Sequence, residues 1–194
     1  MRLNSVKFSQ GSLLPAQVTD LIYIFNTLFA NDEFTVLVRG DKEPFYAPSD
    51  TPEKPHQIIF AHGFFASALH EIAHWCIAGK ARRLLPDYGY WYQPDGRSAE
   101  QQREFARVEI QPQALEWVLS VAAGTEFHFS ADNLGDGQGM ITSPEWSQFQ
   151  NNVIEAARHY VTSGLPLRAK RLVHALAEFY QTGDRWRHPG NYKL

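Results

Sequence analysis

The segment from Phe64 to Ala78 is apolar around nearly the whole circumference of a helix, yet it carries an H-E-x-x-H motif at residues 70–74. A helix of this composition passes through a protein core. Side chains four residues apart lie on one face of a helix, so His70 and His74 would direct both imidazoles to one point. A divalent metal offsets the cost of burying them beside Glu71. The motif therefore predicts a metal site on a buried central helix, and core histidines bonded to backbone carbonyls are the alternative.

The end of this helix is also marked in the sequence. Gly79 is expected to be its capping glycine, and the cations Lys80, Arg82 and Arg83 follow. Cations stabilise the negative end of a helix dipole. We therefore expect the helix to end near Ala78.

A catalytic metal needs a third protein ligand, which is sought downstream of the motif. The candidates are Glu109, Glu116, Glu104, Asp95 and His128. Glu109 is preferred, because it stands between Val108 and Ile110 in an apolar segment where an unpaired carboxylate is costly. Glu116 is the second choice, as a ligand or as a partner that holds an imidazole, and a solvated helix position is its competing interpretation.

Two further residues are candidates for catalytic roles. Glu71 points about 100° around the helix from His70, which suits a general base or an outer carboxylate better than a ligand. His62 is placed with Gly63 at the junction between a strand and the helix. An active-site role and a capping or packing role are both open for His62.

Two histidines and one carboxylate suit more than one reaction. With Zn(II), Glu71 would activate water for hydrolysis, as in a zincin peptidase. With Fe(II), the same three ligands leave positions for oxygen and the reaction is oxidative. The secretion or membrane context usual for a peptidase is weak here, which favours oxidation. A purely structural metal is the third possibility, but the single cysteine, Cys76, lies about 200° around the helix from His74 and is expected to be core packing.

Apolar patterning along the chain predicts one α+β domain over residues 13–184, with helices packed on a small β-sheet. Helical spacing recurs from Leu14 to Phe29, and two further helices are expected after Pro144 and Pro166. Buried strands are expected at Phe34–Val38 and Ile58–Ala61. Residues 1–12 and 185–194 are expected to be flexible tails.

Four other segments have weaker signals. Residues 40–57 contain four prolines and are expected to be a loop, either a disordered insertion or a lid. The aromatic residues 88–92 are expected to form an edge strand or to wall a substrate cleft. Residues 126–129 are expected to form a short strand. Pro112 is expected to break, kink or restart a helix that runs to Gly124.

The charge of the chain excludes some partners. A net charge of −3 gives no general attraction for nucleic acids or anionic membranes. The first seven residues lack the features of a signal peptide, and no apolar run is long enough to span a bilayer. We therefore expect a cytoplasmic protein with no direct nucleic-acid or membrane partner, and a single cysteine agrees with a reducing compartment.

Four stretches of sequence carry a resemblance when they are taken together. They are Phe60–Phe64 (FAHGF), His70–Arg83 (HEIAHWCIAGKARR), Gly89–Arg97 (GYWYQPDGR) and Val108–Trp117 (VEIQPQALEW). Together they resemble the bacterial elongation factor P hydroxylase family, and the likeness runs from about Phe25 to Tyr180.

This resemblance implies a non-haem Fe(II) enzyme with molecular oxygen as co-substrate. Its implied partner is elongation factor P, on which it would hydroxylate a lysine already extended with a β-lysyl group. The metal ligands implied are His70, His74 and Glu109. Because that side chain carries two ammonium groups, the cleft is expected to present carboxylates and aromatic rings; the candidates are Asp95, Glu116, Asp132, Tyr90 and Trp91.

Overall fold

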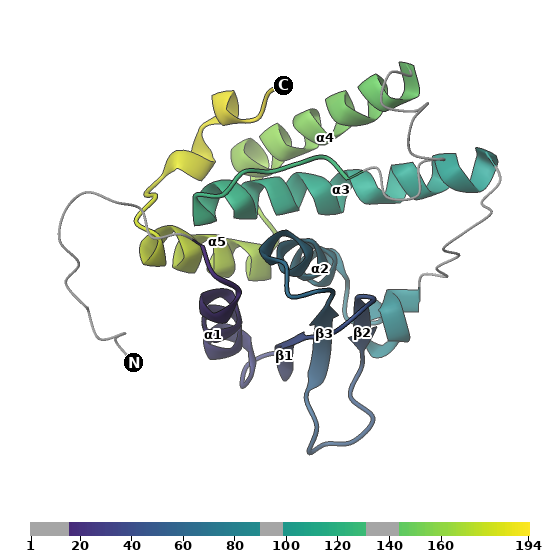
Figure 1. Cartoon of the computed structure of the whole chain (residues 1–194), viewed down its shortest axis with the longest axis vertical. Helices are drawn as coiled ribbons and strands as arrows, with labels where there is room; N and C mark the ends of the chain where they lie inside the picture. Colours follow the sequence, from purple (N-terminus) through teal and green to yellow (C-terminus); the bar gives the residue numbers. More distant parts are fainter. Residues whose placement is uncertain (1–15, 90–98, 131–143) are drawn as a thin grey trace.

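The computed structural model describes residues 16–89, 99–130 and 144–194 (Figure 1). Helices predominate in it, and one small sheet lies at the end of the molecule opposite α4, so the expected α+β class is confirmed. The expected tail at residues 1–12 and the aromatic residues 90–92 lie outside the described ranges. The helices and strands are α1 (Val18–Phe29), β1 (Thr35–Arg39), β2 (Phe45–Ala47), β3 (His56–Phe60), α2 (Phe65–Ile77), α3 (Ala99–Ala123), α4 (Pro144–Ser163) and α5 (Leu167–Phe179).

The sheet has the strand order β1-β3-β2, with β3 parallel to β1 and antiparallel to β2. Leu37 and Tyr46 both pair with Ile58 in the register, so one row of side chains crosses all three strands. All three side chains are buried. This row forms the face of the sheet that packs on the core, and both strands expected from the sequence are confirmed within two residues.

The expectation of a loop over residues 40–57 is wrong, because this segment contains β2 and the start of β3. Tyr46 fixes the short strand: its ring is buried, and its backbone N–H donates to Asp87 Oδ1 at 2.8 Å. A three-residue strand between Pro44 and Pro48 has too few residues to show a period of two. It forms because it pairs with β3, which the local sequence does not reveal.

Helix α2 lies in the centre of the molecule and contacts β3, α1, α3 and α5 (Figure 1). Its expected extent is confirmed. The expected glycine cap is wrong, because the chain leaves the helix at Ala78 in an extended conformation (φ −59°, ψ 125°) and Gly79 has no left-handed backbone. The last carbonyl groups of α2 find their partner elsewhere, as described below.

Helix α3 continues through Pro112, so the expected break at this residue is wrong. A proline inside a helix removes one hydrogen bond and costs about 3 kcal/mol. Every residue from Pro112 to Ser120 is buried, and α3 contacts α2, α4 and α5. Packing on all sides therefore outweighs the local cost. The helix ends as expected before Gly124, whose φ of 71° suits glycine.

The two closing helices, α4 and α5, are confirmed, but residues 185–194 are not a frayed tail. Trp186 is 4% exposed and Tyr192 is fully buried. The ring of Tyr192 lies 5.5 Å from that of Trp117 on α3. These two aromatic side chains anchor the end of the chain in the core.

The expected strand at residues 126–129 is also wrong, since residues 125–130 adopt no regular secondary structure. Phe127 and Phe129 pack on Trp117, with ring centroids 4.8 and 5.4 Å away, while Glu126 and His128 are exposed. Alternation of apolar and polar residues imitates a strand here, although packing of two rings orders the segment.

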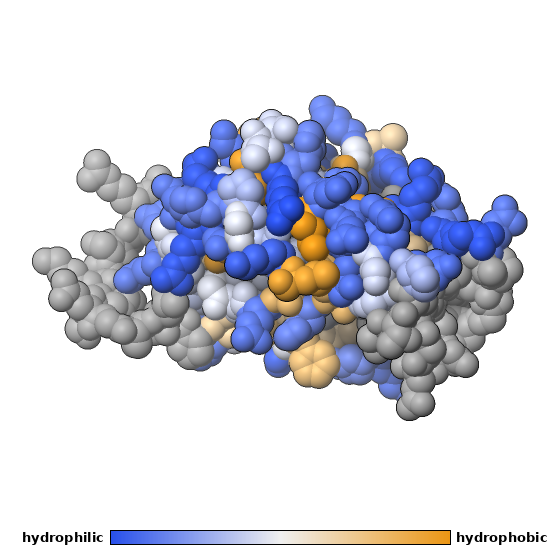
Figure 2. Space-filling view, turned by 90° about the horizontal axis from the view of Figure 1, so that it is seen from above, coloured by the Kyte–Doolittle hydropathy of each residue, from blue (hydrophilic) through white to orange (hydrophobic). Residues whose placement is uncertain are grey.

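Figure 2 shows the molecule from the end at which α4 and the C terminus lie. The described surface on this face is mainly hydrophilic, and apolar residues gather only in a narrow strip near its centre. Among the described residues, no helix has both the length and the apolar composition that crossing a bilayer requires.

Candidate metal centre

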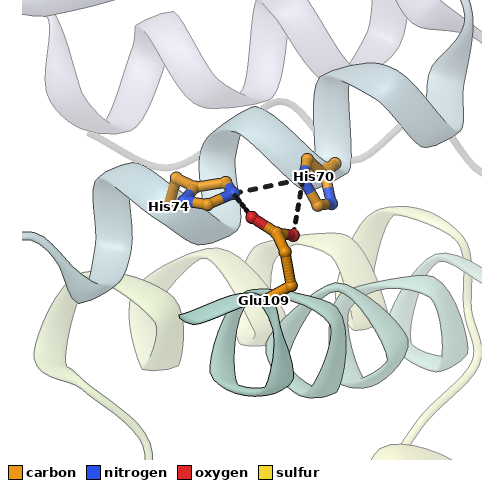
Figure 3. Close-up of side chains that lie close together, drawn as sticks. All are labelled: His70, His74 and Glu109. Atoms are coloured by element: carbon orange, nitrogen blue, oxygen red, sulfur yellow. Dashed lines mark hydrogen bonds and ion pairs between the residues drawn. The ribbon is translucent and has the colours of Figure 1, made fainter. Parts of the chain in front are cut away.

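Helix α2 presents His70 and His74 on the face that looks toward α3 (Figure 3). Their Nε2 atoms lie 3.1 Å apart, and the two rings are inclined at 70°. Both side chains are partly buried. The convergence that the four-residue spacing predicts is therefore present in the structure.

Glu109 reaches the same point from α3 (Figure 3). Its Oε2 lies 3.4 Å from His70 Nε2, and its Oε1 lies 3.3 Å from His74 Nε2. The residue is 7% exposed. His70, His74 and Glu109 thus form a possible metal site between the two helices.

The spacing of these donors fits a single metal ion. With bonds of about 2.1 Å, donors in neighbouring octahedral positions lie about 3.0 Å apart, and donors in tetrahedral positions about 3.4 Å apart. The two nitrogens lie 3.1 Å apart, and each lies 3.3–3.4 Å from a different oxygen of Glu109, so all three contacts fall in this range. Two imidazoles and one carboxylate suit Zn(II) or Fe(II), and three ligands leave positions for other molecules.

Glu116 lies seven residues after Glu109 on α3 and therefore on the same face of that helix. Its Oε2 lies 2.9 Å from His70 Nδ1, and it is 6% exposed. A carboxylate accepts a hydrogen bond, so Nδ1 carries the hydrogen and the lone pair of Nε2 faces Glu109 and His74. Glu116 thus contacts the imidazole of His70 as an orienting partner, which is one of the roles expected for it, and it is not one of the three converging donors.

The charges at the site favour a cation. Burial opposes the charged form of His70, but the hydrogen bond that His70 donates to Glu116 and the charges of Glu109 and Glu116 outweigh it and raise the pKa of His70 to about 10. Burial likewise opposes the charged form of Glu109, yet His74 and His70 lower its pKa to about 2. The two carboxylates therefore stabilise a positive charge between the imidazoles. In the metal-free protein a proton supplies this charge, and a bound metal ion would replace the proton.

Gln113 is a supporting residue that the sequence reasoning missed. It is 2% exposed; its Nε2 donates to the Ser130 carbonyl at 3.0 Å, and its Oε1 accepts from the Ser130 N–H at 3.2 Å. A hydrogen bond from Gln113 also contributes to the low pKa of Glu109. Gln113 follows Glu109 by four residues, a spacing that places both on one face of a helix. The expected break at Pro112 would place them on separate elements, so the spacing does not identify Gln113 from the sequence.

A second unexpected group lies beside His74. Asp87 and Tyr88 adopt left-handed backbone angles, with φ of 45° and 58°, which are uncommon for residues other than glycine. The Tyr88 ring stacks on Tyr46 at 4.3 Å and is nearly parallel to the His74 ring, 6.4 Å away. Tyr88 therefore lies in a tight turn and not in the expected edge strand, and it forms an aromatic wall against a candidate ligand.

Glu71 is partly buried and is not one of the three converging donors. Burial raises its pKa, and the negative charges of Glu109 and Asp87 act in the same direction, while His70 and His74 oppose them. A carboxyl group whose pKa is raised binds its proton more tightly than an ordinary carboxyl group does, which makes Glu71 a candidate for proton transfer.

The remaining candidates that the structure describes are not among the three donors. His62 is exposed at the turn before α2. Its backbone N–H donates to the Asp41 carbonyl at 3.2 Å, and its ring lies 5.7 Å from that of Phe64. Glu104 pairs with Arg107 on the surface. The exposed His128 lies beside Glu126 (see above). The other candidates, Asp95, Asp132, Tyr90 and Trp91, lie outside the described residues.

Comparison with known proteins identifies the family of this chain. The family model described as elongation factor P hydroxylase matches residues 24–188, a range that contains all the residues of the candidate centre. A protein of Haemophilus influenzae named elongation factor P lysine hydroxylase is 50% identical over 168 residues, which cover 87% of this chain and 92% of that relative. The chain therefore belongs to the elongation factor P hydroxylase family.

Proposed function

We propose that this chain hydroxylates a lysine of elongation factor P, with Fe(II) held by His70, His74 and Glu109. The observation that supports the proposal most is the convergence of these three residues in a member of this family, with contacts of 3.1–3.4 Å between their nitrogen and carboxylate oxygen atoms. Such a ligand set with open positions is typical of non-haem Fe(II) oxygenases. The family favours this reaction over the zinc hydrolase that the motif alone also allowed.

Bound Fe(II) would supply the redox chemistry that allows molecular oxygen to react with an unactivated C–H bond. The protein residues do the rest. Glu116 keeps the hydrogen of His70 on Nδ1 and so presents Nε2 to the metal. Gln113 holds the Glu109 carboxylate, and the ring of Tyr88 limits where the imidazole of His74 can move. Glu71 has a raised pKa and is neither one of the three donors nor the partner of His70 Nδ1, so it is assigned the proton transfers.

The substrate in this proposal is the lysine that already carries a β-lysyl group. Two ammonium groups on that side chain require carboxylate partners. Glu116 is occupied by His70, so Asp95 and Asp132 are the candidates that the sequence offers for this contact. We place the reaction in the cytoplasm, where a translation factor is modified.

The proposal is tested by the intact mass of β-lysylated elongation factor P after incubation with the Fe(II)-loaded protein, oxygen and a reductant. A gain of one oxygen atom is expected. His70→Ala and His74→Ala should abolish the gain, whereas His159→Ala, which changes an exposed histidine of α4, should preserve it. A gain that persists in both ligand variants would contradict the proposed centre, and no gain at full iron occupancy would contradict the proposed reaction.

A further inference from the structure

Two arginines one turn apart on α5 cap the C-terminal ends of two different helices. Arg171 donates to the Leu28 carbonyl of α1 at 2.7 Å, lies 4.8 Å over the Phe29 ring and pairs with Asp32 at 2.9 Å. Arg168 makes the carbonyl and ring contacts with the end of α2, and its carboxylate partner, Glu33, lies between α1 and β1. The two side chains are therefore structural counterparts, but only Arg168 contacts the helix that carries His70 and His74.

Arg168 binds the open end of α2 through one nitrogen. Its Nη2 atom lies 2.8, 3.2 and 2.6 Å from the carbonyl oxygens of Trp75, Cys76 and Ala78. The last carbonyl groups of a helix have no partner within the helix. A cation at this end also interacts favourably with the helix dipole. Arg168 thus supplies the cap that the sequence assigned to Gly79.

The guanidinium of Arg168 is itself fixed in place. It lies 4.6 Å over the ring of Trp75, and Glu33 Oε2 is 3.8 Å from its Nη1 atom. Arg83 approaches the same Trp75 ring at 5.8 Å and pairs with the same Glu33 oxygen at 2.7 Å. Trp75 is fully buried. The end of α2 is therefore clamped between two cations that share one carboxylate.

This clamp acts on the turn that carries His74. Trp75 follows His74 directly, and the His74 carbonyl accepts the N–H of Ala78, whose own carbonyl binds Arg168. Neighbouring residues on a helix point about 100° away from each other. Arg168 and Arg83 therefore contact Trp75 on one side of the last turn, while His74 faces α3 on another. Movement of this turn would displace one donor from the other two.

We propose that Arg168 is a positioning residue of the metal centre, which holds the last turn of α2 so that His74 meets His70 and Glu109. The role rests on the proposed function of these three residues as metal ligands. Arginine suits it because the planar guanidinium can lie on an indole ring and donate in its own plane at the same time. Lysine would keep the charge without this geometry.

The test uses Co(II) as the probe, because its visible spectrum reports coordination geometry. The full-length protein is titrated with Co(II) beside Arg168→Gln, Arg168→Lys and the matched control Arg171→Gln, and thermal unfolding is recorded for each. Arg168→Gln should weaken Co(II) binding about tenfold and change the spectrum, an effect of the size seen for outer partners of metal ligands. Arg168→Lys should restore part of the affinity. Arg171→Gln should lower the melting temperature comparably while affinity and spectrum stay unchanged.

Each result decides the question. Unchanged Co(II) affinity and spectrum in Arg168→Gln, or equal losses in Arg171→Gln, would overturn the positioning role and leave the metal centre intact. If Arg168→Gln does not fold, the spectrum and affinity of Arg168→Lys decide in the same way. Failure of the unaltered protein to bind Co(II) would overturn the metal centre itself, and the positioning role with it.

Discussion

Glu116 Oε2 lies 2.9 Å from His70 Nδ1, while the Nε2 atom of the same ring faces Glu109 and His74. One carboxylate of α3 thus orients an imidazole whose other nitrogen meets a second carboxylate of the same helix. Partners of this kind fix both the tautomer and the direction of a metal ligand.

Removal of this contact should weaken metal binding without abolishing it. We expect Glu116→Ala to raise the dissociation constant for Co(II) about 10–100-fold, and Glu116→Gln to have a smaller effect because its amide oxygen can still accept from Nδ1. Glu109→Ala, which removes a donor, should have the largest effect. The surface variant Glu104→Gln on the same helix is the control and should bind as the unaltered protein does. Equal affinities for Glu116→Ala and Glu104→Gln would contradict the orienting role.

Replacement of Glu71 should separate metal binding from turnover. Glu71→Gln keeps the size of the side chain but cannot exchange a proton, so the rate of hydroxylation should fall about 10²-fold or more. Metal content, measured on the same sample, should stay at that of the unaltered protein. Loss of the metal together with activity would instead make Glu71 a ligand, and an unchanged rate would leave it without a role in proton transfer.

The local part of the site could be predicted from the sequence, because His70 and His74 lie four residues apart on one apolar helix. Its apolar neighbours and the family resemblance both indicate Glu109 as the third ligand. The sequence does not predict the shared face of α3 that carries Glu109, Gln113 and Glu116. A proline usually ends a helix, so Pro112 suggests that these residues lie on two separate elements. Only the burial of α3 on all sides keeps it continuous.

Contacts between distant residues explain the other differences. Strand β2 depends on pairing with β3, and the cap of α2 comes from Arg168 on α5, 90 residues beyond Ala78. Trp186 and Tyr192 are surrounded by polar residues in the sequence. No helical or strand-like spacing of apolar residues therefore predicts that they are buried. Pairing and packing of this kind leave no pattern in the segments themselves.

The end of the chain should contribute to stability. Tyr192→Ala removes a fully buried ring that packs on Trp117, and we expect it to lower the free energy of unfolding by about 3–5 kcal/mol. Tyr23→Ala, which removes an exposed ring on α1, should change it by no more than about 0.5 kcal/mol. Urea unfolding of both variants measures the difference. Similar midpoints would mean that residues 185–194 are a tail after all.

Cys76 should be unreactive while the protein is folded. Burial raises the pKa of its thiol to about 12, so at pH 8 almost none of it is the reactive thiolate. Unfolding returns the pKa to about 8.5 and exposes the sulfur. A thiol reagent at pH 8 should therefore label Cys76 only as fast as the protein opens, and urea should accelerate the labelling. Rapid labelling of the folded protein would contradict the buried position.

We expect the centre of His70, His74 and Glu109 to insert oxygen into a lysine of elongation factor P. The most direct measurement is peptide mapping by mass spectrometry after reaction under isotopically labelled oxygen gas. We predict that the labelled oxygen appears on the β-lysylated lysine, and that Glu109→Ala abolishes it. Oxygen that comes from water, or labelling that Glu109→Ala leaves unchanged, would contradict the account.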